Sequence, residues 1–484
     1  QAVDVFVAAA RLDGLEVQPA KCRVLDMHPP DPEAAMEIII NGSIIPTTSE
    51  GIEVCGVPIG TPEFISSFVD RTGTAIAAAA DLVLALGHAQ VELLLLRYSI
   101  QAKATHVCRA LTPEQTDALG GLQRQVVLDA VAKVAGAVRS SFDERTHSRF
   151  VGRIFMTRKD GGLGFHDPRA LGAAAYGGAW GLVTGARQRD HLHPKVLGAL
   201  DKVFQPDRLL GIRNSLAGAL TRCYVQAGVE ADRIEGLVTE EINSMLQGSS
   251  ELRIKGQHQL MSMTRKGDYE RFLRLLGEDK EAKAHYISTT GPHGSALFWA
   301  LPSDHDTTMC NADFQLAMRI WLDLPFGLVG GAGVDTPGQP AVRCVCRGRP
   351  VLTDRHLTGC RDSSKGWRSL RHDLVSKGVI PKLLAKVHIP FRIEPRGLFG
   401  DQGGPDHRIP AWPANGGGEV YLDFTTKLVK SADVVGAASG QALAAAGKAE
   451  HAKLAKYENA IKRIRGDQCT FRPLVVESGG AFGK

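Results

Sequence analysis

The sequence predicts a multidomain protein, mainly α-helical over its first two thirds and α/β at its C-terminus. Apolar residues recur at helical spacing through most of the first 320 positions. Near the C-terminus, runs rich in branched residues alternate with helical patterns. The predicted helices are 366–387, interrupted near Gly378 and Pro381, and 440–464. The predicted strands are 389–395, 405–409, 419–426 and 470–477. A Gly/Pro-rich segment, 327–342, separates the two kinds of pattern.

Composition and charge describe an ordinary globular protein. Of the 484 residues 44% are hydrophobic and 23% charged, and the net charge of +5 tolerates an anionic partner without requiring one. No window approaches the roughly 18 uninterrupted apolar residues of a membrane span, so no membrane partner is expected. Nine cysteines in a chain of this length do not suggest a disulfide framework, which favours a reducing, intracellular compartment. Because Gln1 lies within a helical pattern, we expect the sequence to be a fragment of a longer protein.

Residues 1–60 alternate between one helix and short extended runs. An amphipathic helix is followed by an expected strand near Leu15–Val17, and the Asn41-Gly42 pair predicts a hairpin turn between branched residues. Gly56, Pro58 and Gly60 predict a rigid loop that leads into a helix over 61–71.

The helical part contains two features with both a structural and a functional interpretation. The glycine-rich segment 159–168 (KDGGLGFHDP) predicts a turn, because no phosphate-binding Lys-Ser/Thr follows it. The segment 253–283 carries eight basic residues among apolar ones. It is either a solvated helix face or a surface that contacts nucleic-acid phosphates.

Three cysteines and a histidine predict a zinc site. Cys344, Cys346, His356 and Cys360 follow the spacing C-x-C-x9-H-x3-C, and the last two share one face of a helical turn. Zinc prefers such sulfur and nitrogen ligands in tetrahedral geometry. A closed structural Zn²⁺ site would also stabilise the fold around three basic residues that can contact nucleic acid: Arg347, Arg349 and Arg355.

Two acidic residues in neighbouring strands predict a catalytic magnesium site. Asp406 follows a proline in a turn, and Asp423 lies within an apolar run typical of a buried strand. Glu394, from the strand before, is a third candidate ligand, and Glu419 is a rival of Asp423. Carboxylate oxygens hold Mg²⁺, which lowers the pKa of a bound water and stabilises a phosphate in its transition state.

A lysine near these acids would position the attacking water or neutralise charge. Thr425 occupies the position two residues after Asp423, and Lys427 lies on the same strand face. Lys453 and Lys456 on the Ala-rich helix are the other candidates. Lys453 shares a helix face with Glu450 and Tyr457, which favours Lys453 for the catalytic position.

These motifs, in this order, resemble the C-terminal part of non-LTR retrotransposon reverse transcriptase polyproteins. The segment with Lys21 and Cys22, then VCGVPIG (54–60), resembles the end of the polymerase palm and its primer-grip hairpin. The cysteines resemble the family's CCHC knuckle. Pro405-Asp406 with Asp423 resembles its restriction-like PD-(D/E)XK endonuclease, and the segment 450–457 resembles its E-x-x-K-x-x-K-Y. His372 resembles the histidine of an RH(N/D) motif, and we expect it to pack or to contact phosphate.

The resemblance implies five segments: 1–60, end of the palm with the primer grip; 61–170, thumb-like helices; 171–340, helical linker; 341–362, zinc knuckle; 363–484, endonuclease. It implies DNA target and RNA template as partners, an upstream polymerase region of the same polyprotein that carries the polymerase aspartates, and action in the nucleus. The implied activity is Mg²⁺-dependent nicking of target DNA to prime reverse transcription. The alternatives are a catalytically inactive nucleic-acid-binding remnant, and a helical structural or interaction protein.

Overall fold

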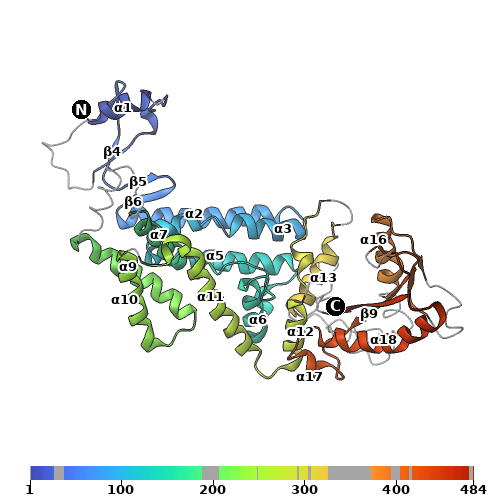
Figure 1. Cartoon of the computed structure of the whole chain (residues 1–484). Coiled ribbons are helices and arrows are strands. Elements are labelled where there is room, and N and C mark those ends of the chain that lie inside the picture. Colours follow the sequence, from blue (N-terminus) through green and yellow to red (C-terminus); the bar gives the residue numbers. More distant parts are fainter. Residues whose placement is uncertain are drawn as a thin grey trace. The chain divides into compact units, whose positions relative to one another are not determined.

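The computed structural model describes residues 2–12, 14–26, 38–187, 206–247, 249–291, 294–303, 307–324, 372–393, 404–413, 417–478 and 483. The described chain is mostly helical, with a four-stranded sheet near the C-terminus (Figure 1), as the sequence predicts at this coarse level. It forms two compact units: Gln1–Leu82, Tyr98–Val127 and His166–Gly267 in the first; Val83–Arg97, Leu128–Phe165 and Asp268–Lys484 in the second. None of the helices that the structure describes combines the length and the apolar character that a bilayer span needs.

The first unit begins with short elements: α1 (Ala2–Leu12), a 3₁₀ turn (Pro19–Lys21), β1 (Val24–Leu25), β2 (Ile39–Ile40), β3 (Ser43–Ile44), β4 (Thr47–Thr48), β5 (Gly51–Val54) and β6 (Val57–Gly60). Strands β2 and β3 form the expected hairpin, with positive φ at Asn41 (50°) and Gly42 (78°). This is the turn that an Asn-Gly pair adopts readily. The predicted hairpin at this position is confirmed.

Two expectations for this region are wrong. Leu15–Val17 is not a strand: the chain there is irregular before the 3₁₀ turn that starts at Pro19. The expected rigid loop with Gly56, Pro58 and Gly60 is instead strand β6, paired antiparallel with β5. The turn between them places Cys55 at φ 52° and Gly56 at φ 74°, and the tolerance of glycine for positive φ permits the tight reversal.

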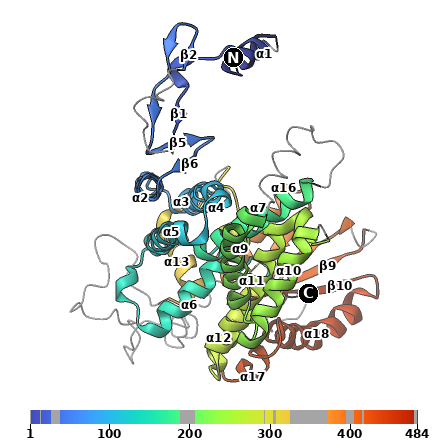
Figure 2. The ribbon, with the colours of Figure 1, turned by 90° about the vertical axis from the view of Figure 1, so that its left-hand side faces the viewer.

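The remaining helices of the first unit are α4 (Thr105–Ala110), α7 (Pro168–Arg187), α9 (Pro206–Gln226) and α10 (Ala231–Gln247). Three described helices begin in the first unit and end in the second: α2 (Pro62–Leu84, longer than the predicted 61–71), α5 (Pro113–Val134) and α11 (Leu252–Leu276). Helices α7, α9, α10 and α11 lie side by side in Figure 2.

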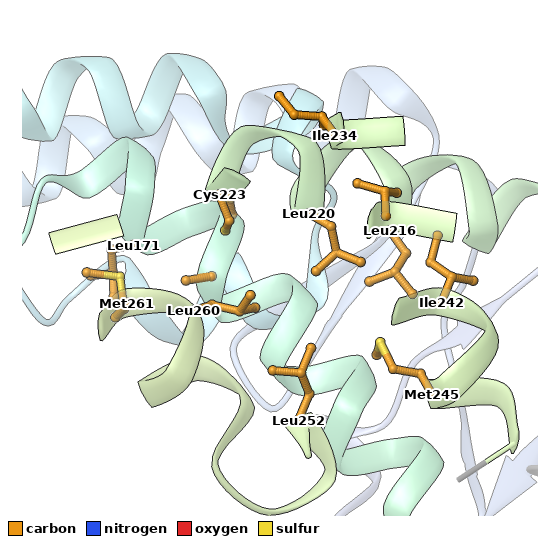
Figure 3. Packing of buried hydrophobic residues seen from close by; sticks show 13 residues of the cluster. Leu171, Leu216, Leu220, Cys223, Ile234, Ile242, Met245, Leu252, Leu260 and Met261 are labelled. Atoms are coloured by element: carbon orange, nitrogen blue, oxygen red, sulfur yellow. The ribbon is translucent and has the colours of Figure 1, made fainter. Parts of the chain in front are cut away.

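These four helices bury one apolar cluster, shown in Figure 3. Leu220 from α9 and Met245 from α10 are at most 1% exposed within it. The glycines of α7 allow close packing: a Cβ at Gly178 would lie 2.3 Å from the backbone nitrogen of Gln257. The Ala/Gly-rich composition of this stretch is therefore explained by helix contact rather than by a ligand.

The helical part of the second unit contains α3 (Ala89–Leu95), α6 (Glu144–Phe155), α12 (Lys280–Thr290) and α13 (Asn311–Leu322), with 3₁₀ turns at Arg139–Ser141 and Ala296–Phe298. A short π-helix, Leu96–Ile100, begins in this unit and ends in the first. Its core includes the guanidinium of Arg153, whose Cζ lies 3.8 Å from the centroid of the Trp321 ring. Burial lowers the pKa of Arg153 to about 10. The aromatic ring supplies a cation–π contact that offsets part of the cost of burying the charge.

The C-terminal α/β part follows the chain order helix, three strands, helix, strand. Its elements are the π-helix η5 (Leu374–Val379), α16 (Ile380–Lys386), β7 (Arg392–Ile393), β8 (His407–Ile409), β9 (Val420–Lys427), α17 (Val435–Ala438), α18 (Ala444–Arg465) and β10 (Thr470–Glu477). The sheet order is β10-β9-β8-β7, antiparallel between β7, β8 and β9 and parallel between β9 and β10. A parallel pair needs a crossover connection, and α18 supplies it.

Alternate side chains of β9 pack on opposite faces of this sheet. Leu422 and Phe424 join a cluster with Ile380 and Leu384 of α16, whereas Tyr421 packs with Tyr457 of α18. In Figure 1 the sheet accordingly lies between α16 and α18. The result is a three-layer arrangement in which a central strand presents its two faces to two different helices.

Ile409 of β8 provides a test of this core, because it is 0% exposed in the cluster on the α16 face. We expect Ile409→Val to lower the free energy of unfolding by about 1 kcal/mol, the usual cost of removing one buried methylene. Ile393→Val removes the same group from a side chain that is 41% exposed, so its effect should stay below about 0.5 kcal/mol. Urea titrations of both variants make the comparison, and equal losses would contradict the buried position of Ile409.

Candidate active site

Asp406 directly precedes strand β8, and Asp423 lies in the adjacent antiparallel strand β9. The pairing of β8 with β9 begins at His407 opposite Leu422, so Asp406 and Asp423 are the next residues of the two chain segments beyond that pair. The backbone N–H of Phe424, the residue after Asp423, donates to the carboxylate of Asp406, which brings the two acids close together. Both residues are buried, at 8% and 3% exposure. The end of the strand pair therefore places two acids near each other in a poorly solvated position.

Asp406 is held by two hydrogen bonds to one of its oxygens. Its Oδ2 accepts from the backbone N–H of Phe424 at 2.6 Å and from Nε2 of His372 at 3.1 Å. Because a carboxylate only accepts, Nε2 of His372 must carry the proton. Both bonds recorded within the described part of the chain use Oδ2, which leaves Oδ1 for another ligand.

Asp423 forms an ion pair with a lysine of the facing helix. Its Oδ2 lies 2.5 Å from Nζ of Lys453 on α18. Burial raises the pKa of Asp423, the negative charge of Asp406 raises it further, and Lys453 opposes both effects. Like charges close together disfavour ionisation, which is the direction in which Asp406 acts on Asp423.

Of the candidate lysines, Lys453 is the one beside the acids. Lys427, although on the same strand as Asp423, pairs with Asp433 at 2.8 Å. Lys456 donates to the hydroxyl of Tyr457 at 2.7 Å. The two lysines of α18 are three residues apart, and they differ in their partners: Lys453 pairs with Asp423, whereas Lys456 bonds to Tyr457.

The rival acid Glu419 has different partners. It forms an ion pair with Arg408 and accepts a hydrogen bond from Sγ of Cys469 at 3.2 Å. Partial burial raises the pKa of Glu419, but the hydrogen bonds from Arg408 and Cys469 outweigh this effect, and the pKa is lowered. Asp423, not Glu419, is thus the acid near Asp406.

A second histidine, His407, did not emerge from the sequence pattern. It is fully buried, and its Nε2–H donates to the backbone carbonyl of Ser376 at 2.6 Å. Burial lowers its pKa, which keeps the ring neutral. Ser376 lies in the π-helix η5, which begins two residues after His372, so His407 links that helix to the strand that follows Asp406. Successive side chains of a strand point to opposite faces of a sheet, and this rule could have indicated the position of His407. His407 follows Asp406 directly and faces the side of the sheet on which η5 lies.

The other predicted site residues lie outside the described residues. These are Glu394, the four zinc candidates (Cys344, Cys346, His356, Cys360) and the three arginines of the knuckle (Arg347, Arg349, Arg355). Among the residues that the structure does describe, no group of three or more His, Cys, Asp or Glu side chains forms a metal-binding cluster. Of the predicted magnesium ligands, Asp406 and Asp423 are the ones within the described residues.

The donor set at these two residues fits a hard divalent cation. Carboxylate oxygens are the ligands that Mg²⁺ prefers, and one or two of them suffice when waters and a substrate phosphate complete the shell. Two adjacent buried carboxylates repel each other, and a bound cation relieves that repulsion. Lys453 neutralises one of the two charges in its absence.

The raised pKa of Asp423 has a consequence for stability. A carboxyl whose pKa is higher in the folded state than its ordinary 3.8 binds its proton more tightly when folded, so stability falls as the pH rises from that value through the folded pKa. We expect Asp423→Asn, in EDTA, to remove this decline and to leave stability at pH 7 equal or higher. Urea titrations between pH 4 and 7 measure it, and Asp467→Asn at an exposed position is the control. A variant that keeps the wild-type decline would contradict the assigned burial.

No protein-family model matches this chain, and no curated protein matches it either.

Proposed function

We propose that the α/β part of this chain is a Mg²⁺-dependent endonuclease that hydrolyses one strand of DNA. The observation that carries the proposal is the proximity of Asp406 to Asp423 beside Lys453, on a mixed sheet with the order helix, three strands, helix, strand. This order and the Pro-Asp pair before β8 resemble the restriction-like endonucleases.

The chain's own residues have distinct tasks in this proposal. Asp406 and Asp423 hold the cation through their oxygens, and His372 and the Phe424 amide fix the orientation of Asp406. When bound, Mg²⁺ lowers the pKa of a water and stabilises negative charge on the scissile phosphate. Nζ of Lys453, whose side chain is 29% exposed, lies beside Asp423 and would orient the water or the phosphate.

The order of segments supports a wider assignment: the C-terminal part of a non-LTR retrotransposon polyprotein. What supports it is the order of elements: the hairpin β5–β6 includes the segment 54–60 that resembles the primer grip, and helices follow it in the chain. In this proposal the chain binds target DNA and template RNA in the nucleus, a structural Zn²⁺ is held by Cys344, Cys346, His356 and Cys360, and an upstream region supplies polymerase activity.

Metal removal tests the activity. The chain, freed of divalent ions with EDTA, should leave supercoiled plasmid intact and should convert it to the open-circular form when Mg²⁺ is restored. Ca²⁺ is the matched control, because it occupies oxygen sites with longer bonds and looser geometry. Nicking that persists in EDTA, or that never appears with Mg²⁺, would overturn the proposal.

A catalytically inactive nucleic-acid-binding remnant is the second candidate, and one observation favours it. Gly404 occupies the position before Pro405 where the resembling nucleases carry a basic residue. Loss of that charge removes one phosphate contact near the carboxylates. The remnant would bind DNA in a salt-dependent manner and would not nick plasmid with any divalent cation.

A further inference from the structure

The second unit contains a cavity of about 450 Å³ that the nuclease proposal does not use. It lies between the glycine-rich turn after α6, the end of α11 and helix α12. Lys159 and Asp160 come from the turn, Tyr269 from α11, and Lys283 and Tyr286 from α12. Ligand pockets for small molecules have volumes of about 300 to 1,000 Å³, so the cavity can hold a single nucleotide.

The lining of the cavity carries a net positive charge. Lys159 is exposed and Lys283 is half-buried, and both line the cavity. The single lining acid, Asp160, accepts a hydrogen bond from the hydroxyl of Thr157 at 2.6 Å, which directs its Oδ2 into the turn. Two lysines against one acid leave a net positive charge, which attracts a phosphate group.

The wall of the cavity is aromatic and apolar. The half-buried ring of Tyr269 lines it together with Tyr286, Leu273 and Ile287. The hydroxyl of Tyr286 donates to the backbone carbonyl of Asp160 at 2.6 Å, which fixes the turn against α12. Burial, with the neighbouring hydroxyl of Tyr269, raises the pKa of Tyr286, so this hydroxyl remains a donor. A flat base stacks readily on such a tyrosine, whatever its identity.

We infer that this cavity binds one nucleotide unit of a single-stranded nucleic acid, with the phosphate at Lys159 and Lys283 and the base against Tyr269. Positive φ at Gly161 (70°) and Gly164 (74°) allows the tight reversal of the chain that follows Lys159. The inference does not depend on an active carboxylate site.

The test is the affinity of the full chain for a fluorescein-labelled, single-stranded oligothymidylate, measured by anisotropy in EDTA so that nuclease activity plays no part. The double variant Lys159→Gln/Lys283→Gln should bind about tenfold more weakly, with a shallower salt dependence. Tyr269→Ala should lose about tenfold, and Tyr269→Phe should restore wild-type affinity because the ring is kept. Lys266→Gln/Lys280→Gln is the matched control, since it removes two exposed lysines of α11 and α12 that do not line the cavity.

Three outcomes would overturn the inference. Equal weakening by the two double variants would make the effect a general property of a basic surface. Unchanged affinity of Tyr269→Ala would remove the base contact. The third outcome combines two results: thymidine monophosphate binds in a way that depends on Lys283, and the variants leave the affinity for the oligonucleotide unchanged. The cavity would then bind a free nucleotide rather than a strand.

Discussion

Asp406→Ala and Asp423→Asn are each expected to lower the rate of plasmid nicking by about a hundredfold to several hundredfold. Asp406 directly precedes β8 and accepts from the amide next to Asp423 in β9, and in the proposal each acid supplies oxygen to the same cation. Loss of one electrostatic contact to the transition state costs roughly 3–4 kcal/mol, and each 1.4 kcal/mol is a factor of ten in rate. Initial rates of open-circle formation at saturating Mg²⁺ measure the effect.

The matched control for these two variants is Asp467→Asn, which removes one acid from an exposed position after α18. Its nicking rate should equal that of the wild type. Because the two carboxylates act as a unit, the double variant should be no slower than either single variant. Two results would show that the acids do not act together on one cation. One is a double variant whose loss of rate equals the product of the two single losses. The other is a nicking rate that neither single change lowers.

Lys453→Gln is expected to lower the nicking rate by about a hundredfold, whereas Lys427→Gln should leave it within about twofold of wild type. Nζ of Lys453 lies 2.5 Å from Asp423, and that of Lys427 lies 2.8 Å from Asp433. Removal of a preorganised donor from a reacting phosphate typically costs a factor of 10²–10³. The rate at saturating DNA separates this effect from weaker binding, which would raise KM alone.

Lys456→Gln provides the third member of the series, because it removes the same charge from the same helix. Its Nζ bonds to the hydroxyl of Tyr457, so we expect a small loss of stability and little loss of rate. A larger effect at Lys456 or Lys427 than at Lys453 would refute the assignment of the lysine.

The sequence was informative where local patterns dominate. Strand Thr470–Glu477 has the predicted limits, because a run of branched and aromatic residues there is bounded by a polar turn and Ser478. The Asn41-Gly42 hairpin follows from one dipeptide with a strong preference for positive φ. The turn at Cys55-Gly56 was not recognised, because cysteine rarely occupies such a position and Pro58 suggested a loop.

The site was less accessible to sequence reasoning, because its contacts join residues far apart in the chain. The choice among Lys427, Lys453 and Lys456 depends on how α18 is rotated over β9, and helical spacing alone left two of them on the helix as candidates. His372 and Asp406 are 34 positions apart in the sequence, and their contact depends on the π-helix that begins at Leu374. A π-helix has no clear sequence signature, although Pro381, which lacks an N–H, lies shortly after this one.

The most direct test of the central claim counts the cations held by the two carboxylates. Mn²⁺ replaces Mg²⁺ at oxygen sites, and electron paramagnetic resonance reports the free ion during a titration. The account predicts at least one Mn²⁺ site in the wild-type chain, lost in Asp406→Asn and equally in Asp423→Asn, and retained in Asp467→Asn. A site that survives both single changes at 406 and 423 would contradict it.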